Sequence, residues 1–229
     1  AEKVVDKIIR YSSPEAMGDW RNTICFVADD EDGRTHMLQA DGFAKRIDTV
    51  YESYNIKKIY FDAYKQESTP GGQRYPDAKE ALNQTVQNGA LIVNYTGHGG
   101  ETGWAHERVL EIPDISSWGN KYALPLFVTA TCEFSRFDDP DRIAGGERVI
   151  MNPNGGGIAL LTTVRLVYSG ANARLNNAFY ERIFEPVNGE MPRLGDVFRE
   201  VKNTVEDQNS RNFTLLGDPA VRLNYPKYA

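Results

Sequence analysis

Two residues of the 229-residue chain combine a reactive side chain with a setting that favours chemistry: Cys132 and His98. Cys132 directly follows the apolar run 125–131, and His98 stands in Thr-Gly-His-Gly-Gly, just after the apolar run 90–95. A thiol attacks a carbonyl as its thiolate, and a neighbouring imidazole can take its proton. The pair therefore predicts acyl transfer through a thioester.

The backbone around these two residues can assist the same reaction. The glycines beside His98 allow a substrate to approach closely, and the N–H groups of Gly99 and Cys132 could together form an oxyanion hole. Losing one such donor typically costs ~3–4 kcal/mol of transition-state stabilisation. The other cysteine, Cys25, lies inside an apolar run and is predicted to be a packing residue of the core.

Metal sites receive weaker support from the sequence. Asp30 and Asp32, followed by a glycine, are spaced like part of a calcium-binding loop, but the distal glutamate of such a loop is missing. His36 and His106 have no second ligand at metal-binding spacing, which argues against zinc. The loop is interpreted as a solvated, helix-capping segment.

The elements that must position these residues alternate along the chain. Continuous apolar runs of this length are typical of strands buried on both faces, and segments with helical spacing lie between them. This order predicts an α/β fold with an open, mostly parallel sheet flanked by helices, in which the active site lies at the carboxyl ends of the strands. His98 and Cys132 would then face each other if their strands are neighbours. The predicted strands are 23–28, 57–61, 90–95, 125–131 and 157–163; the predicted helical stripes cover 37–54, 76–88, 175–183 and 194–205.

Composition excludes some classes of function. The chain carries 26 basic and 32 acidic residues, a net charge of −6, whereas nucleic-acid binding needs a basic face. Its apolar runs are far shorter than the ~20 residues of a membrane span. The polar stretch 66–75 is predicted to be a surface loop, and because no low-complexity linker divides residues 1–229, a single domain is expected.

Three motifs resemble the gingipain-type cysteine peptidases, a family of the caspase-like clan. They are Tyr-Thr-Gly-His-Gly-Gly at 95–100, Thr-Ala-Thr-Cys at 129–132 and Leu-Leu-Gly-Asp-Pro-Ala at 215–220. The 34-residue interval from His98 to Cys132 is similar to that of the family. The resemblance covers nearly the whole chain and implies a caspase-like three-layer sandwich. Family members also carry a second caspase-like subdomain and an immunoglobulin-like domain, so this chain is expected to be the catalytic part of a longer protein.

Within this family, the segments 132–138 and 103–107 are most similar to the PorU-type sortases of the type IX secretion system. That resemblance implies an enzyme that removes C-terminal sorting domains from secreted cargo and can join the new carboxyl end to an anionic lipopolysaccharide. It also implies other secretion-system subunits as partners. The expected location is extracytoplasmic, at the outer-membrane surface or in the periplasm of a Gram-negative bacterium. No cofactor is required, and a structural calcium ion at Asp30 and Asp32 is compatible with the family.

The resemblance assigns roles to individual residues. Cys132 is the nucleophile, and His98 is the general base and later the general acid. Asp29 or Asp30, at a neighbouring strand end, is the expected orienting acid. The expected substrate-binding residues, by their position after the strand that follows Cys132, are Thr163, Arg165 and Tyr168.

Two alternatives stay open at this point. The chain could be a non-catalytic caspase-like scaffold of a secretion complex, in which Cys132 would react no faster than an ordinary thiol. It could also be a flavodoxin-like ligand-binding domain, which would carry a bound chromophore.

Overall fold

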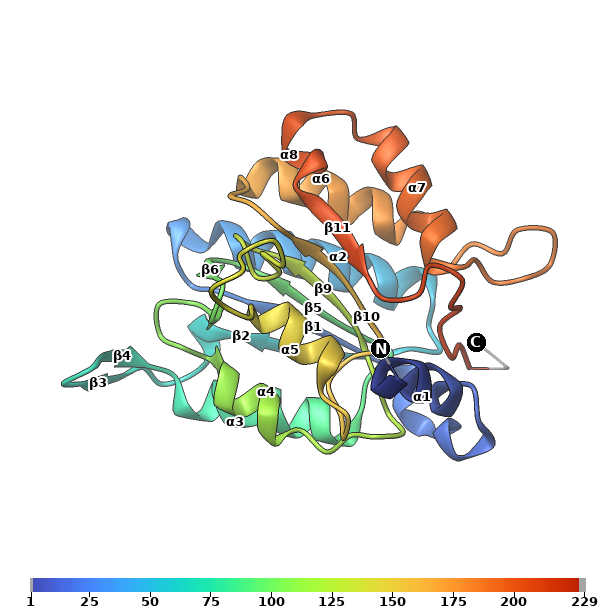
Figure 1. Ribbon diagram of the computed structural model, residues 1–229. Coiled ribbons are helices and arrows are strands. Elements are labelled where there is room, and N and C mark those ends of the chain that lie inside the picture. Colours follow the sequence, from blue (N-terminus) through green and yellow to red (C-terminus); the bar gives the residue numbers. More distant parts are fainter. Residues whose placement is uncertain (1, 227–229) are drawn as a thin grey trace.

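A six-stranded sheet forms the centre of the computed structural model, which describes residues 2–226 (Figure 1). Five strands run parallel, and β11, at one edge, runs antiparallel to β10. The spatial order is β11-β10-β9-β5-β1-β2, with bounds β1 (Thr23–Ala28), β2 (Asn55–Tyr60), β5 (Ile92–Thr96), β9 (Leu126–Ala130), β10 (Ala159–Thr163) and β11 (Phe213–Leu216). The mostly parallel sheet predicted from the apolar runs is confirmed.

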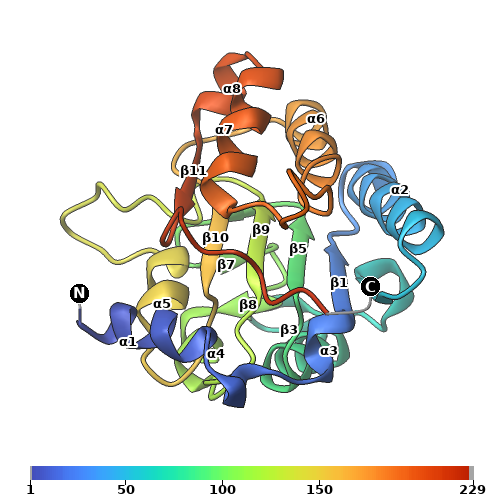
Figure 2. The ribbon, with the colours of Figure 1, turned by 90° about the vertical axis from the view of Figure 1, so that its right-hand side faces the viewer.

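Helices cover both faces of the sheet, giving three layers (Figures 1 and 2). One face is covered by α2 (Thr35–Val50), α6 (Ser169–Tyr180), α7 (Leu194–Thr204) and the short α8 (Gln208–Arg211). The other face carries α3 (Pro76–Asn88), α4 (Ile112–Ser117) and α5 (Gly145–Met151), with α1 (Glu2–Tyr11) packed beside α5. Within residues 2–226, no helix is both long and apolar enough to cross a membrane.

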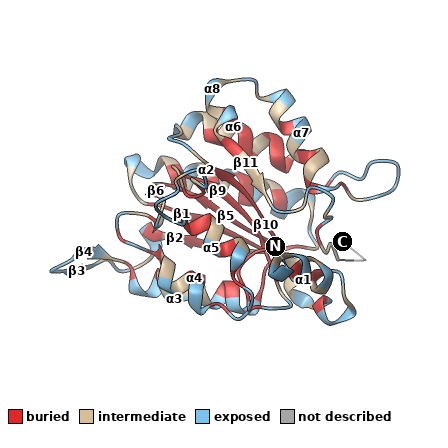
Figure 3. Cartoon of the chain, viewed as in Figure 1, coloured by how far each residue is buried: buried red, intermediate tan, exposed pale blue. Residues whose placement is uncertain are grey.

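Alternation along each central strand produces two separate cores. In β1, Ile24 and Phe26 belong to the core under α2 and α6, whereas Cys25 and Val27 belong to the core on the side of α3 and α5. Successive side chains of a strand point to opposite faces, so a strand covered on both sides needs apolar residues at every position. Figure 3 shows the resulting buried sheet between half-exposed helices.

Two predicted elements differ from the structure. The helical stripe predicted to reach residue 54 ends with α2 at Val50, although Tyr54 beyond it is still buried in the core. The predicted surface loop 66–75 is instead a small hairpin of β3 (Glu67–Thr69) and β4 (Gly72–Arg74). Because almost every side chain of this hairpin is exposed, it has no buried face to leave a hydrophobic pattern in the sequence.

A buried lysine fastens the first helix to the rest of the molecule. Lys7 of α1 is only 1% exposed, and its Nζ donates to the carbonyls of Val149, Ile150 and Gly157 at 3.0–3.2 Å. Three acceptors offset the cost of removing the amine from water.

Smaller elements surround the carboxyl edge of the sheet. A three-stranded sheet of very short strands, β6 (Gly99–Gly100), β7 (Gly103–Trp104) and β8 (Leu110–Glu111), follows His98. The described residues also form the 3₁₀ helices η1 (Pro14–Ala16), η2 (Asp19–Asn22), η3 (Asp32–Arg34) and η4 (Phe61–Ala63).

Candidate active site

His98 and Cys132 lie beyond the carboxyl ends of two neighbouring strands, β5 and β9. Thr96 of β5 is paired with Ala130 of β9, so each candidate residue stands two positions past the same rung of the ladder. The Gly97 N–H still donates to the Ala130 carbonyl at 3.4 Å. The two strands are therefore adjacent, the condition on which the predicted juxtaposition depended.

The backbone of His98 is held on both sides. Its N–H donates to Asp29 Oδ2 at 2.8 Å, and its carbonyl accepts from the Tyr95 hydroxyl at 2.5 Å and from the Ala105 N–H at 2.9 Å. Tyr95 is itself stacked on Trp104, with ring centroids 4.4 Å apart. Buried hydrogen bonds of this kind fix the backbone position from which the His98 side chain extends.

Glycines flank His98 because the space beside it is already filled. A Cβ on Gly97 would lie 2.3 Å from the Asp29 Cβ, and a Cβ on Gly99 would lie 2.6 Å from Thr131 Oγ1. These distances are far inside van der Waals contact. The glycines thus allow three strand ends to meet closely around His98.

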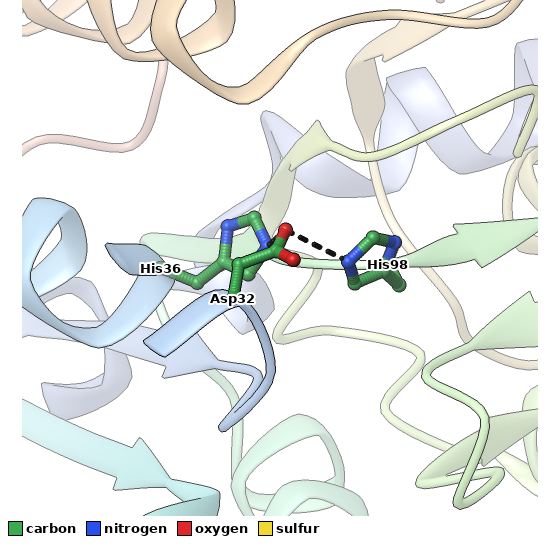
Figure 4. Close-up of side chains that lie close together, drawn as sticks. All are labelled: Asp32, His36 and His98. Carbon is green, nitrogen blue, oxygen red and sulfur yellow. Dashed lines mark hydrogen bonds and ion pairs between the residues drawn. The ribbon is translucent and has the colours of Figure 1, made fainter. Parts of the chain in front are cut away.

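The ring of His98 faces the carboxylate of Asp32. Its Nε2 lies 3.0 Å from Asp32 Oδ2 and 3.6 Å from Glu31 Oε2 (Figure 4). The Nε2 atom of a second histidine, His36, lies 3.2 Å from the same Asp32 oxygen. The hydrogen bond from His98 is the main cause that holds the pKa of Asp32 below its usual value.

The backbone that presents Asp32 is in an unfavourable conformation. Asp32, Gly33 and Arg34 have φ values of 56°, 61° and 71°, so two of these three consecutive left-handed residues carry a side chain. The Asp32 carbonyl accepts from the Thr35 hydroxyl at 2.7 Å. Such strain persists only where surrounding contacts enforce it, and it is concentrated at functional sites.

The acids predicted to orient His98 are placed differently from the expectation. Asp29 is fully buried and holds the His98 backbone rather than its ring. Asp30 accepts from the Tyr75 hydroxyl at 2.7 Å. The carboxylate that meets the ring is Asp32, which the sequence suggested only as part of a solvated, helix-capping loop or a calcium site. The sequence carried no signal for this contact, because Asp32 lies before α2 in left-handed backbone, where helical spacing to His36 does not apply.

Cys132 is partly exposed, and its Sγ lies 3.6 Å from the Val167 carbonyl oxygen. No hydrogen bond joins Sγ to His98 within residues 2–226; such contacts are often long before substrate binds. The next residue, Glu133, has φ 51°, another left-handed residue with a side chain. Cys132 therefore occupies a sharp turn rather than an extension of β9.

Among the described residues, the N–H groups of Gly99 and Cys132 lie at this edge without a hydrogen-bond acceptor. Because the Ala105 N–H donates to the His98 carbonyl, Gly99 and Trp104 form a non-hydrogen-bonded pair, and the Gly99 N–H points away from β7. The Cys132 N–H has no acceptor in the described part of the chain. Both groups predicted for the oxyanion hole are thus available to a carbonyl oxygen.

Only part of the predicted substrate-binding set is accessible. Thr163 is fully buried, and its hydroxyl donates to the Thr131 carbonyl, so it supports the Cys132 turn and cannot reach a substrate. The side chain of Arg165 is half-exposed but paired with Asp138, whose carboxylate accepts at 2.9 and 2.5 Å. Tyr168 is 79% exposed and free to contact a ligand.

An ion-pair cluster joins the loops on either side of the site. Glu101, in the hairpin that follows His98, accepts from Arg136 at 2.9 Å and from Arg142 at 3.0 Å. Both arginines belong to the loop that follows Cys132. The Glu101 side chain is only 12% exposed, so the cluster ties the two loops together more firmly than surface pairs do.

The possible calcium site at Asp30 and Asp32 is not formed as expected, because the two carboxylates belong to different clusters of side chains. Asp30 instead meets Asp29 and Glu107, and the ligand atoms of these three lie within 4.8 Å of one another. Within residues 2–226, Asp30 Oδ1 and Glu107 Oε2 are buried without a hydrogen-bond partner. Burial, followed by the charges of Asp30 and Asp29, raises the pKa of Glu107. A set of carboxylate oxygens alone suits calcium rather than zinc.

A three-layer α/β fold with histidine and cysteine at the ends of adjacent parallel strands defines the class of caspase-like proteins. The chain belongs to peptidase family C25, whose family model matches residues 1–224. That membership removes the flavodoxin-like alternative. A search of the curated proteins finds no match.

Solved structures share this fold at low sequence identity. The arginine-specific cysteine proteinase gingipain R (RgpB) superimposes with a TM-score of 0.78 at 18% identity, over 97% of this chain and 52% of that one. The RgpB chain in the complex of Porphyromonas gingivalis pro- and mature domains gives 0.75 at 16% identity, over 97% and 53%. The Saccharomyces cerevisiae separase–securin complex gives 0.58 at 13% identity, over 94% and 13%. The chain thus spans about half the length of the gingipain structures and has the expected caspase-like fold.

Proposed function

We propose that this chain is the catalytic part of a cysteine endopeptidase and transpeptidase that works through a thioester on Cys132. The observation that carries the proposal is the placement of Cys132 and His98 at adjacent strand ends, with the His98 ring held by Asp32 at 3.0 Å. A thiol, an imidazole and a carboxylate in sequence are the parts of an activated nucleophile.

The hydrogen bond to Asp32 indicates which His98 nitrogen carries a hydrogen and which one can accept the thiol proton. A carboxylate only accepts, so Nε2 carries the hydrogen and Nδ1 keeps the lone pair that takes the Cys132 proton. The thiolate attacks the scissile carbonyl, and the N–H groups of Gly99 and Cys132 stabilise the oxyanion. His98 then gives its proton to the departing amine, which leaves a thioester. Water or an incoming amine attacks the thioester, giving up a proton to His98 and releasing the Cys132 thiol.

The charges around Cys132 favour uncharged substrate residues. Two acids of the loop that contains Cys132 have arginine partners: Asp138 pairs with Arg165, and Glu133 lies 3.9 Å from Arg136. A carboxylate paired in this way is less available to an arginine side chain of a substrate. Tolerance of small or neutral residues before the cut suits an enzyme that processes many different proteins.

The substrates we assign are secreted proteins with C-terminal sorting domains. The support is the similarity of segments 132–138 and 103–107 to the PorU-type sortases. An anionic lipopolysaccharide would be the acceptor, other secretion-system subunits would be partners, and the outer-membrane surface or periplasm would be the location.

The test uses the full-length protein, a cargo protein with its sorting domain, and a glycine peptide as amine acceptor. Mass spectrometry of the cargo junction should find cleavage before the sorting domain and an adduct at the new carboxyl end. Asp32→Asn should lower the rate by about 10²-fold or more, because the His98 ring loses the acceptor that fixes its tautomer. Asp138→Asn is the matched control, since Asp138 contacts Arg165 but not His98, and should change the rate far less.

Each other outcome removes part of the proposal. A free acid as the sole product, at every acceptor concentration, would leave a hydrolytic endopeptidase. Intact cargo together with an unreactive Cys132 would favour the alternative, a non-catalytic caspase-like scaffold of a secretion complex.

A further inference from the structure

The carboxylate of Asp32 lies between two histidines, and only one of them is used by the proposed reaction. His98 Nε2 and His36 Nε2 lie 3.0 and 3.2 Å from the same oxygen, Asp32 Oδ2 (Figure 4). The two rings meet edge to face, with centroids 5.3 Å apart. His36 therefore adds a second imidazole that a peptidase of the proposed kind does not need.

The three groups have the chemistry of a transition-metal site. Two imidazole nitrogens and one carboxylate oxygen form a recurrent zinc donor set, and all three donor atoms lie within 4.8 Å of one another. Zinc bonds of 2.0–2.2 Å in a tetrahedral arrangement place neighbouring donors roughly 3.3 Å apart. The 3.0 and 3.2 Å separations from Asp32 are already close to that value.

The surroundings allow an ion to enter and hold part of the site in place. His36 is only 4% exposed, whereas the side chains of Asp32 and His98 are 54% and 37% exposed. Metal would thus arrive from solvent and meet one rigid buried ligand. Glu31 Oε2 lies 3.6 Å from His98 Nε2 but outside this cluster, so the fourth position of a tetrahedral ion would be open to water.

We propose that Asp32, His36 and His98 form an inhibitory binding site for zinc or a similar transition-metal ion. Zinc binding itself does not depend on the function proposed above; its inhibitory effect rests on the role of His98 in that function. The site differs from one made of the nucleophile and its base, because Cys132 is not a ligand.

Proton accounting explains why bound metal would stop the reaction. In the metal-free site both Nε2 atoms carry hydrogen and donate to Asp32. A metal takes the Nε2 lone pair, so in each ring the proton moves to Nδ1 and no proton leaves the protein. In residues 2–226 His36 Nδ1 has no hydrogen-bond partner, so the shift breaks no bond there. His98 Nδ1 becomes a donor and can no longer accept the Cys132 proton.

The test measures zinc binding to the full-length protein by calorimetry, with four variants. The wild type and Cys132→Ala should bind one zinc ion with affinities within about threefold. His36→Ala should weaken binding at least tenfold. Asp32→Asn, a change at an exposed position, should weaken it similarly and keeps the test decisive if the buried His36 variant does not fold. His106→Ala is the matched control, because His106 stacks on the His98 ring at 5.6 Å but lies outside the cluster.

Two further measurements distinguish this site from a metal site that includes the Cys132 sulfur. Cobalt bound in place of zinc should show no thiolate-to-cobalt charge-transfer band. Zinc should inhibit wild-type turnover reversibly, and each variant that turns over is compared with its own zinc-free rate. Loss of binding in Cys132→Ala with full binding in the His36 and Asp32 variants, or no binding in the wild type, would overturn the proposal. Binding without any effect on measurable turnover would overturn the inhibitory part alone. If the protein cuts no cargo but binds zinc through His36, the proposed function is refuted and the proposed metal site is not.

Discussion

The two cysteines of this chain occupy the same sheet and have opposite surroundings. Cys25 lies in the middle of β1, fully buried between α3 and the neighbouring strands, and burial raises the pKa of its thiol to about 12. Cys132 lies two residues beyond β9, partly exposed, on a sharp turn next to the loop of His98. Within a strand a thiol is surrounded by apolar side chains on both faces; past the end of the strand it meets solvent and polar loops.

This difference shows that position along a strand decides what a cysteine can do. The ladder that buries Cys25 ends at the same level on β1, β5 and β9, and the residues one to three positions beyond it include Asp29, the glycines around His98, and Cys132. Parallel strands thus bring reactive groups from three distant parts of the sequence to one edge.

The contrast between the cysteines is tested most strongly by removing each thiol. Cys132→Ala should abolish cleavage, a loss of about 10⁴-fold or more, because no other group can form the thioester. Cys25→Ala should retain nearly full activity at a temperature where it is folded. Initial rates of cargo cleavage measure both. If Cys25→Ala is inactive and Cys132→Ala is active, the assignment of Cys132 as the nucleophile is wrong.

A second test asks whether Cys132 depends on its neighbour. At pH 7, His98→Ala should slow alkylation of Cys132 by iodoacetamide about tenfold or more, because the group that accepts the thiol proton is lost. Peptide mapping by mass spectrometry follows the labelling of each cysteine separately. In His106→Ala, which keeps the His98 ring, the rate should stay within about twofold. Equal rates in wild type and His98→Ala would exclude His98 as the activating base.

The buried cysteine should show its importance in stability. Cys25→Ala removes a sulfur atom from the core and should lower the free energy of unfolding by about 1–2 kcal/mol. For a domain of this size, that change corresponds to a fall in Tm of roughly 2–8 °C. Calorimetry of Cys132→Ala gives the comparison, since truncating its partly exposed side chain should move Tm much less. Equal losses in the two variants would contradict the assignment of Cys25 to the core.

The smallest effect concerns the acids behind His98. The pKa of Glu107 is raised, so its ionised form is disfavoured in the folded state and lowers stability at neutral pH. Glu107→Gln should therefore raise Tm at pH 7 by about 2–4 °C. This advantage should shrink as pH falls through the raised pKa towards 4.5, where the wild-type carboxyl is protonated in both states. Calcium should stabilise the wild type more than the variant; a variant that melts lower at pH 7 would contradict the argument.

Much of this architecture is predictable because buried parallel strands leave an unmistakable pattern. β1 begins and ends at the predicted residues, and α3 begins at Pro76 and ends just before Gly89, where a proline start and a glycine stop were expected. β11 was not predicted, since it is short and only Phe213 in it is fully buried. Helical spacing did not show that α2 ends at Val50, because Tyr54 beyond it still packs in the core.

The candidate site was predictable only in outline. Strand ends and glycines located His98 and Cys132, because both lie next to regular elements. The placement of Asp32 depends on three consecutive left-handed residues, a conformation that no periodicity announces. Likewise, Thr163 was expected to meet substrate because it ends a strand, but it is fully buried and its hydroxyl donates to the Thr131 carbonyl.

The buried amine of Lys7 imposes an order in time on the making of the molecule. Its three carbonyl partners lie 142 to 150 positions further along the chain. During synthesis the first helix must therefore wait, its lysine hydrated, until the segment up to Gly157 has been made and folded. A contact between such distant positions carries a large loop-closure entropy, so docking of α1 is expected late in folding. Helix α1, although it precedes its three partners in the sequence, is thus among the last elements of this fold to dock.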